Sequence, residues 1–334
     1  MHQSTLREAR PILFGEVLFD RFADGREVLG GAPFNVAWHL RGFGLDPLLI
    51  TRVGRDARGD AVRRTMIAWG LATAGLEVDD RHPTGRVTAQ TDDTGTRFEI
   101  EPEQAYDHIR GDVLERAATL GPVALVYHGT LALRNDASFA ALERLLERTG
   151  AHGFVDLNLR PPWWTAARVD WALARARWVK VNDDELATLT GARCATEEDC
   201  AAAGLGFASR WSLERLVVTR GERGAVLLGD GRRLARTDAA EVAHFVDAVG
   251  AGDAFSAVAL LGLVRAWDPE PTLARASRFA AEICGRRGAT APEPELYRRH
   301  LKAWQSEPAQ GAPRPGPVPG PDPQEPLDPG KSRP

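Results

Sequence analysis

Short apolar runs alternate with longer segments of helical periodicity over most of this chain. The apolar runs have the length of buried strands and occupy residues 11–19, 48–53, 123–127, 153–157, 178–181 and 216–219. Segments with the length and pattern of helices separate or follow them, at residues 34–42, 58–69, 137–148, 183–189, 200–210 and 254–264. Strands that alternate with helices predict an α/β fold, in which helices cover both faces of a mostly parallel sheet.

Ligands of such sheets bind beyond the carboxyl ends of the strands. Four polar residues come at or just past predicted strand ends, namely Asp20, Asn158, Asn182 and Thr219. We therefore expect these side chains to converge on one rim of the sheet.

Two segments do not follow the alternation. Residues 26–29 form a short extended piece, and residues 87–100 alternate in polarity around a turn-like sequence at 92–95, which predicts a hairpin. The pattern leaves two interpretations open: a cover over a site at the rim, or a surface hairpin without a function.

Composition narrows the function classes. The chain has 334 residues, 43% of them hydrophobic, so it can bury one large core. The net charge of −4 and the scattered basic residues do not fit nucleic-acid binding. No apolar run approaches the roughly 20 residues of a membrane span, and residues 1–10 lack a signal-peptide core. We therefore expect a cytoplasmic protein without nucleic-acid or membrane partners.

The cysteines indicate the compartment. The three cysteines have no metal-ligand spacing and fit free thiols in a reducing cytosol, with a Cys194–Cys200 pair as the alternative.

The composition changes at the end of the chain. Residues 308–334 hold 10 of the 22 prolines, few aliphatic residues and no aromatic ones. Such a segment cannot bury enough apolar area to offset its ordering entropy, so we predict a disordered tail.

The segment 247–255 carries the clearest chemistry. It places a carboxylate on each side of two glycines, Gly250 and Gly252, directly before an apolar helical segment. Free N–H groups at a helix start bind anions, so the backbone amides of Ala251, Gly252 and Asp253 predict a phosphate site. A carboxylate at Asp253 suits a base that takes a proton from an attacking hydroxyl. The alternative is an ordinary helix start, with Asp253 as a capping or first-turn acid.

A second glycine block, Gly30-Gly31-Ala32-Pro33-Phe34-Asn35, precedes this segment in the chain. The two blocks in this order resemble the signatures of the PfkB/ribokinase family of sugar and nucleoside kinases, over residues 12–292. Smaller matches keep the family order at residues 156–162, 182–185 and 219–224. The bacterial fructokinase-like members are the most similar, through Gly15-Glu16, Tyr106-Asp107-His108 and Arg160-Pro161-Pro162.

The resemblance implies a ribokinase-like fold: a doubly wound, mostly parallel sheet flanked by helices, in one kinase domain over residues 1–305. It implies a small β lid from about residues 21–33 and 86–101, with Gly30 and Gly31 as hinge, and a homodimer formed through that lid. A lid would exclude water, which competes with the sugar hydroxyl for the phosphoryl group. Residues 306–334 would form the tail.

The resemblance also implies the sugar-binding residues: Asp20, Gly30, Gly31, Asn35, Tyr106, Asn158, Arg160 and Asp247. Alternatives remain for three of them. Asn35 stands where a helix begins and could be an N-cap, Arg160 could form a surface salt bridge, and Asp247 could be a turn residue.

For ATP, the resemblance implies contacts from Asn182, Thr219, Arg220, Gly221, Gly224, Gly252 and Gly288. Glu185, three residues after Asn182, is implied as the Mg²⁺ residue, since one carboxylate with waters and phosphate oxygens suffices for this ion. Some members also place a monovalent cation such as K⁺ near Asp247. Ala248 stands where the family often has threonine, which leaves that cation site open.

The leading hypothesis is an ATP-dependent kinase that phosphorylates a primary hydroxyl of a small sugar, with fructose first. Kinases of 2-keto-3-deoxygluconate or ribose are the alternatives. Two other classes stay open: a sugar-binding protein of this shape without kinase activity, and a dinucleotide-dependent oxidoreductase. Against the last, Gly250 and Gly252 lie late in the chain and lack a third glycine at Rossmann spacing.

Overall fold

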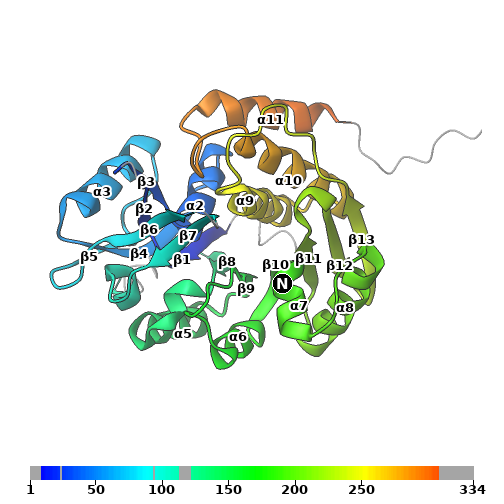
Figure 1. The fold of residues 1–334 in the computed structure, drawn as a ribbon, viewed down its shortest axis with the longest axis horizontal. Helices are drawn as coiled ribbons and strands as arrows, with labels where there is room; N and C mark the ends of the chain where they lie inside the picture. Colours follow the sequence, from blue (N-terminus) through cyan, green and yellow to red (C-terminus); the bar gives the residue numbers. More distant parts are fainter. Residues whose placement is uncertain (1–8, 23–24, 93–94, 113–121, 308–334) are drawn as a thin grey trace, which may run out of the picture.

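A large central sheet organises the chain (Figure 1). The computed structural model describes residues 9–22, 25–92, 95–112 and 122–307. Six of the eight neighbouring strand pairs in this sheet are parallel, and the pairs at one edge, β11/β12 and β12/β13, are antiparallel. Its nine strands lie in the order β13 (Arg232–Thr237), β12 (Ala225–Gly229), β11 (Arg215–Thr219), β10 (Ala176–Asn182), β9 (Gly153–Asp156), β8 (Val123–His128), β1 (Arg10–Phe14), β4 (Leu48–Gly54) and β5 (Leu76–Asp79). The predicted mostly parallel α/β sheet is confirmed.

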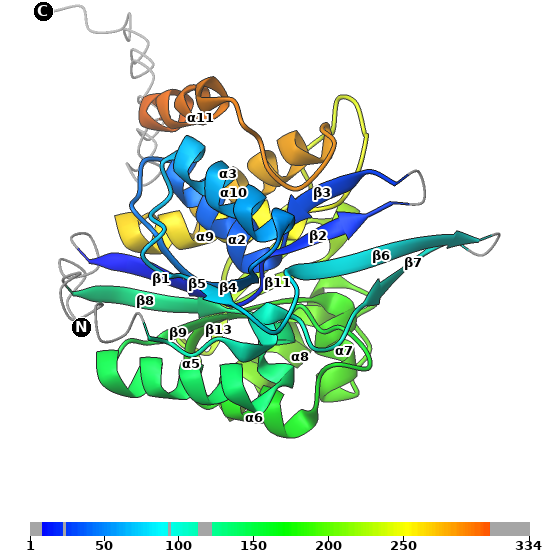
Figure 2. The same cartoon turned by 90° about the vertical axis from the view of Figure 1, so that its left-hand side faces the viewer.

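A second, small sheet extends beyond one end of the large sheet (Figure 2). Its four strands lie in the order β3 (Glu27–Gly30), β2 (Leu18–Arg21), β6 (Gly85–Asp92) and β7 (Gly95–Ile100). Strands β3, β6 and β7 correspond to the two segments that did not follow the alternation. Strand β2 begins at Leu18, before the lid boundary predicted at about residue 21. The prediction of one strand over residues 11–19 was wrong. The chain turns at Gly15, where φ is +142°, and passes from β1 in the large sheet to β2 in the small one.

Helices cover both faces of the large sheet (Figure 2). One face carries α2 (Ala32–Gly42), α3 (Ala57–Trp69), α9 (Ala251–Arg265), α10 (Pro269–Cys284) and α11 (Pro294–Ser306). The other carries α5 (Asp136–Thr149), α6 (Ala166–Leu173), α7 (Asp183–Thr190) and α8 (Glu197–Arg210). Each face has its own apolar core, so the sheet is buried on both sides, as a parallel sheet requires.

Helix α9 lies in the middle of its layer, between α2 and α10 (Figure 1). It is apolar on nearly all sides, and ten of its residues are buried, including the run from Ala254 to Gly262. A helix that is apolar all round has to be buried. The helix start that carries the predicted phosphate site is therefore held by the core.

The compact part of the chain extends slightly further than predicted. Helix α11 continues to Ser306, and the Glu307 carboxylate forms ion pairs with Arg275, at 3.0 Å, and Arg278. The tail boundary predicted at residue 306 therefore comes too early. The rest of the predicted tail, 308–334, lies outside the described residues.

None of the helices in the described ranges is long and apolar enough to cross a membrane.

Two glycines of α8 give a test of core packing. A Cβ at Gly204 would lie 2.4 Å from Leu228 Cδ1, whereas one at Gly206 would meet nothing within 4 Å. We expect G206A to stabilise the protein by about 0.5–1 kcal/mol through helix propensity. G204A should destabilise it by about 1–3 kcal/mol through overpacking. Urea unfolding of both variants checks this, and equal effects at the two positions would contradict the packing.

Candidate active site

The first turn of α9 presents uncapped backbone amides. The helix begins after Gly250, which has a φ of +78° and whose Cβ, if it had one, would lie 2.3 Å from Ala289 Cβ. Only glycine fits there. No side chain caps the helix, and Ala251 N already donates to Ala248 O at 3.2 Å. The predicted phosphate site therefore keeps two of its three amides, those of Gly252 and Asp253, whose N–H groups precede the first intrahelical hydrogen bond.

Asp253 is joined to a residue 218 positions away in the sequence. Asn35 Nδ2 donates to Asp253 Oδ2 at 2.8 Å. Asn35 lies in the first turn of α2, whose N-cap is Gly31, so the capping interpretation of Asn35 was wrong. Its side-chain oxygen is buried and has no partner among the described residues, which leaves a hydrogen-bond acceptor beside the carboxylate.

The environment of Asp253 makes it a better base than an ordinary aspartate. Burial raises its pKa from 3.8 to about 6, and the charge of Asp156 acts in the same direction. The hydrogen bond from Asn35 and the charges of Lys180 and Arg160 lower it. The carboxylate is therefore ionised at neutral pH, yet its proton affinity is close to that needed for proton transfer.

Two more carboxyl groups with raised pKa values face the same region. Burial raises the pKa of Asp20 on β2 to about 6 and that of Glu16 to about 7, and the charge of Asp253 adds to both. Glu16 Oε2 is buried without a partner among the described residues. The sequence placed Glu16 in a motif but not in the site; its position directly after strand β1 was the available signal.

The glycine pair at the end of β3 brings these groups together. A Cβ at Gly30 would lie 3.3 Å from Asp20 Oδ2 and 3.9 Å from the side-chain amide of Asn35. At Gly31, where φ is +109°, a Cβ would lie 2.6 Å from Glu16 O. Side chains at these positions would fill the space between the carboxylate and the amide, or push β2 away from α2.

The remaining predicted sugar residues differ in their placement. Asn158, with a φ of +43°, and the exposed Arg160 follow β9, and the charge of Arg160 lowers the pKa of Glu16, Asp20 and Asp253. Asp247 Oδ1 accepts from Val249 N at 3.0 Å, so Asp247 does form the turn, while its charge still raises the pKa of Asp20. Tyr106 is fully buried in the core, where its hydroxyl has no partner among the described residues.

The predicted metal residue is engaged with backbone groups. Asn182 and Glu185 form a reciprocal cap at the start of α7, with Asn182 N donating to Glu185 Oε2 at 2.9 Å. Glu185 Oε1 accepts from Leu159 N at 2.7 Å, and the residue is only 8% exposed. The lone pairs that remain fit contact with a hydrated Mg²⁺ through water better than direct ligation.

The predicted nucleotide turn follows β11. Gly221 and Gly224 have positive φ values of 55° and 82°, and a Cβ at Gly224 would lie 2.0 Å from Thr237 O. Arg220, which was predicted to contact ATP, is buried, lies 3.6 Å from Glu197 and donates to Arg223 O. It therefore holds the turn together. Thr219 ends β11, and Gly288, with φ +81°, lies against Val28 of β3.

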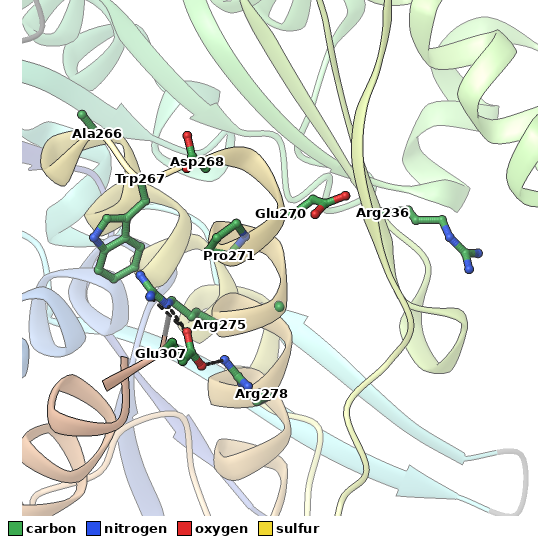
Figure 3. Close-up of a pocket in the computed structure, with 10 residues that line it drawn as sticks. Arg236, Ala266, Trp267, Asp268, Glu270, Pro271, Arg275, Arg278 and Glu307 are labelled. Carbon is green, nitrogen blue, oxygen red and sulfur yellow. Dashed lines mark hydrogen bonds and ion pairs between the residues drawn. The ribbon is translucent and has the colours of Figure 1, made fainter. Parts of the chain in front are cut away.

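A large cavity lies elsewhere in the molecule. It has a volume of about 680 Å³ and is lined by Trp267, Glu270, Pro271 and the ion pair of Arg275 with Glu307 (Figure 3). It adjoins Ala266, just past the C-terminal end of α9. A helix of 15 residues is about 22 Å long, so this cavity is not part of the site around Asp253.

Comparison with known proteins shows which family the chain belongs to. Residues 9–296 match the pfkB family of carbohydrate kinases. The chain belongs to this family. It is 31% identical to a fructokinase of Salmonella typhimurium over 290 residues, which covers 81% of this chain and 90% of the relative. The protein is thus an ATP-dependent carbohydrate kinase, and the resemblance seen in its sequence is confirmed.

Solved structures show the same fold in other carbohydrate kinases. A double mutant of Vibrio cholerae fructokinase, with fructose, ADP and potassium bound, has a TM-score of 0.71 and 25% identity, and covers 88% of this kinase and 98% of its own chain. The 2-dehydro-3-deoxygluconokinase of Thermotoga maritima has a TM-score of 0.75 and 16% identity, over 88% and 100% of the chains. The ribokinase-like fold is confirmed.

The raised pKa of Asp253 predicts a stability gain when its charge is removed. Its pKa of about 6 in the folded state exceeds the ordinary 3.8, so the ionised carboxylate disfavours folding above pH 6, and this penalty disappears as the pH falls towards 4. We expect D253N to have a higher Tm than the original protein at pH 7.5, with a smaller difference at pH 4.5. Thermal melts at both values check this, with D247N as control; a lower Tm of D253N at pH 7.5 would contradict it.

Proposed function

We propose that this kinase transfers the γ-phosphoryl group of ATP to a primary hydroxyl of fructose, with Asp253 as the base. The observation that carries the proposal is the position of Asp253. Its carboxylate, held by Asn35 at 2.8 Å, lies in the same uncapped helix turn whose amides attract phosphate. Proton acceptor and anion site therefore occupy one place.

The proposed reaction uses these groups in one step. The sugar hydroxyl gives its proton to Asp253 while its oxygen bonds to the γ-phosphorus, and the bond from that phosphorus to the ADP oxygen breaks. The amides of Gly252 and Asp253 stabilise the charge on the transferred group. Mg²⁺, when bound, would screen the phosphate charges, and Asn182 and Glu185 would hold it through its water shell.

The charges around Asp253 favour a neutral sugar over a sugar acid. Glu16 and Asp20 each interact with Asp253 and with the cation Arg160, and Asp247 adds a further negative charge near Asp20. The carboxylate of 2-keto-3-deoxygluconate would enter a region that is already rich in negative charge. Hydroxyl groups, in contrast, donate hydrogen bonds to carboxylates and to the free oxygen of Asn35.

The relatives support fructose in particular. The Salmonella protein is a fructokinase, and the Vibrio enzyme is one that binds fructose, ADP and potassium. The Thermotoga 2-dehydro-3-deoxygluconokinase, at 16% identity, supports the fold alone. Ribose would use the same machinery and remains the second neutral candidate.

The small sheet of β3, β2, β6 and β7 would act as a lid over the sugar. Asp20 lies on β2, and Gly30 and Gly31 connect β3 to α2. Movement at these glycines would open and close the space around Asp20 and Asn35, and closure would keep water from the phosphoryl group. A homodimer through this sheet and a K⁺ site near Asp247 remain predictions.

A sugar panel tests the substrate. ADP release is measured in a coupled assay with fructose, ribose and 2-keto-3-deoxygluconate, each with ATP and Mg²⁺. We expect kcat/KM to be highest for fructose and lowest for the acid, because the acid meets the carboxyl groups. Preference for the sugar acid would contradict the charge argument, and sugar binding without ADP release would contradict the proposed reaction.

The base is tested by D253N, which keeps the shape and the acceptor for Asn35. We expect kcat to fall by about 10²–10⁴, the usual range for a general base, with sugar and ATP affinity retained. Affinities are measured by calorimetry, and D230N, at an exposed aspartate of the β12–β13 turn outside the site, serves as the matched control. A D253N enzyme with nearly unchanged kcat would remove Asp253 from this role.

A further inference from the structure

A buried polar cluster lies beneath the first turn of α9. Lys180 Nζ on β10 donates to both carboxylate oxygens of Asp156, each at 2.9 Å. Ser256 Oγ, in α9, donates to Asp156 Oδ2 at 2.6 Å, and the Tyr127 hydroxyl donates to the same oxygen at 3.3 Å. No member is more than 6% exposed. One carboxylate thus ties β8, β10 and α9 to the end of β9.

Stability alone does not account for this pair. Replacing a buried ion pair by apolar groups of similar volume is often neutral or stabilising, because desolvation offsets the attraction. Here burial lowers the pKa of Lys180, but Asp156 outweighs it, so the pKa is raised and the ammonium stays charged. The core therefore holds a charged ammonium, bonded to both oxygens of the Asp156 side chain.

The pair also lies close to the reacting groups. A Cβ built on Gly252 would lie 3.6 Å from Lys180 Nζ, which places the ammonium next to the backbone that offers its amides to phosphate. Both charges act on Asp253 as well. A positive charge behind the amides adds to the field that attracts an anion.

We infer that Asp156 and Lys180 are positioning residues of phosphoryl transfer: the pair anchors the first turn of α9 through Ser256 and balances the charge felt by Asp253. The inference rests on the proposed function, in which Asp253 is the base. It assigns a role to two residues, Asp156 and Lys180, that are not among the predicted sugar and nucleotide contacts.

The two partners act on Asp253 in opposite directions. Asp156 raises its pKa and Lys180 lowers it. The other groups near Asp253 come from α2, β8, β2 and the loops after β1 and β9, and are Asn35, Tyr127, Asp20, Glu16 and Arg160. None of these groups is changed in variants of Asp156 or Lys180. The sign of the shift in the Asp253 pKa therefore reports the effect of the substituted partner alone.

The test is the acid limb of the pH profile of kcat/KM, measured with fructose. D156N should move the limb to lower pH and K180M should move it to higher pH, each by about half a unit or more. The double variant D156N/K180M removes both charges, avoids a lone buried carboxylate, and should bring the limb back towards the original position.

Two serine variants separate anchoring from general packing. S256A removes the bond from α9 to Asp156 and should lower kcat at least tenfold without moving the limb. S138A removes another fully buried hydroxyl, which bonds to Tyr106 O and Ile109 N on the face of the sheet opposite to α9. It should leave kcat nearly unchanged when folding, checked by circular dichroism, is intact.

A direct titration keeps the two proposals distinguishable. NMR of ¹³C-labelled aspartate, with Asp253 assigned from D253N, follows its carboxyl pKa independently of catalysis. Opposite shifts of the Asp253 pKa in D156N and K180M support the inference even when D253N keeps its rate. An unchanged rate of D253N would contradict only the proposal that Asp253 is the base. Shifts of the same sign, or no shift with loss of Tm alone, would overturn the inference and leave a packing role.

Discussion

The hydrogen bond between Asn35 and Asp253 is the contact on which the site depends. It joins the first turn of α2 to the first turn of α9, two helices packed on the same face of the sheet. Because both turns begin at glycines with positive φ, neither helix start is blocked by a side chain. The amides, the carboxylate and the amide oxygen therefore open onto one space, in which we propose that the sugar is phosphorylated.

Much of the fold follows from local pattern. Strands β8, β10 and β11 and the apolar helix after Gly250 were predicted within a few residues, because each is a short apolar run or a strongly apolar helical segment. Strands β12 and β13 and helices α10 and α11 were not predicted. Strand β13 reads Arg-Arg-Leu-Ala-Arg-Thr, and α11 is rich in charge, so their place is set by packing against neighbours rather than by composition.

The site was predictable where backbone geometry demands a residue type. Gly31 and Gly250 could be recognised because turns of this kind need glycine. The side-chain partners could not: Asn35 proved to be no cap, Arg220 is held by Glu197, and the Asp156–Lys180 pair joins residues whose importance depends on strand order. A sequence shows which charged groups are present, but not which of them are buried close enough to interact strongly.

The path from β1 to β2 has a mechanical consequence. The large sheet and the small sheet are joined there by only three residues, Gly15, Glu16 and Val17. A rotation of one sheet against the other would therefore move the Glu16 carboxyl. In the proposed kinase, a shift of the small sheet would thus also displace a buried carboxyl beside Asp253, so that binding of the sugar and the position of this sheet would be coupled.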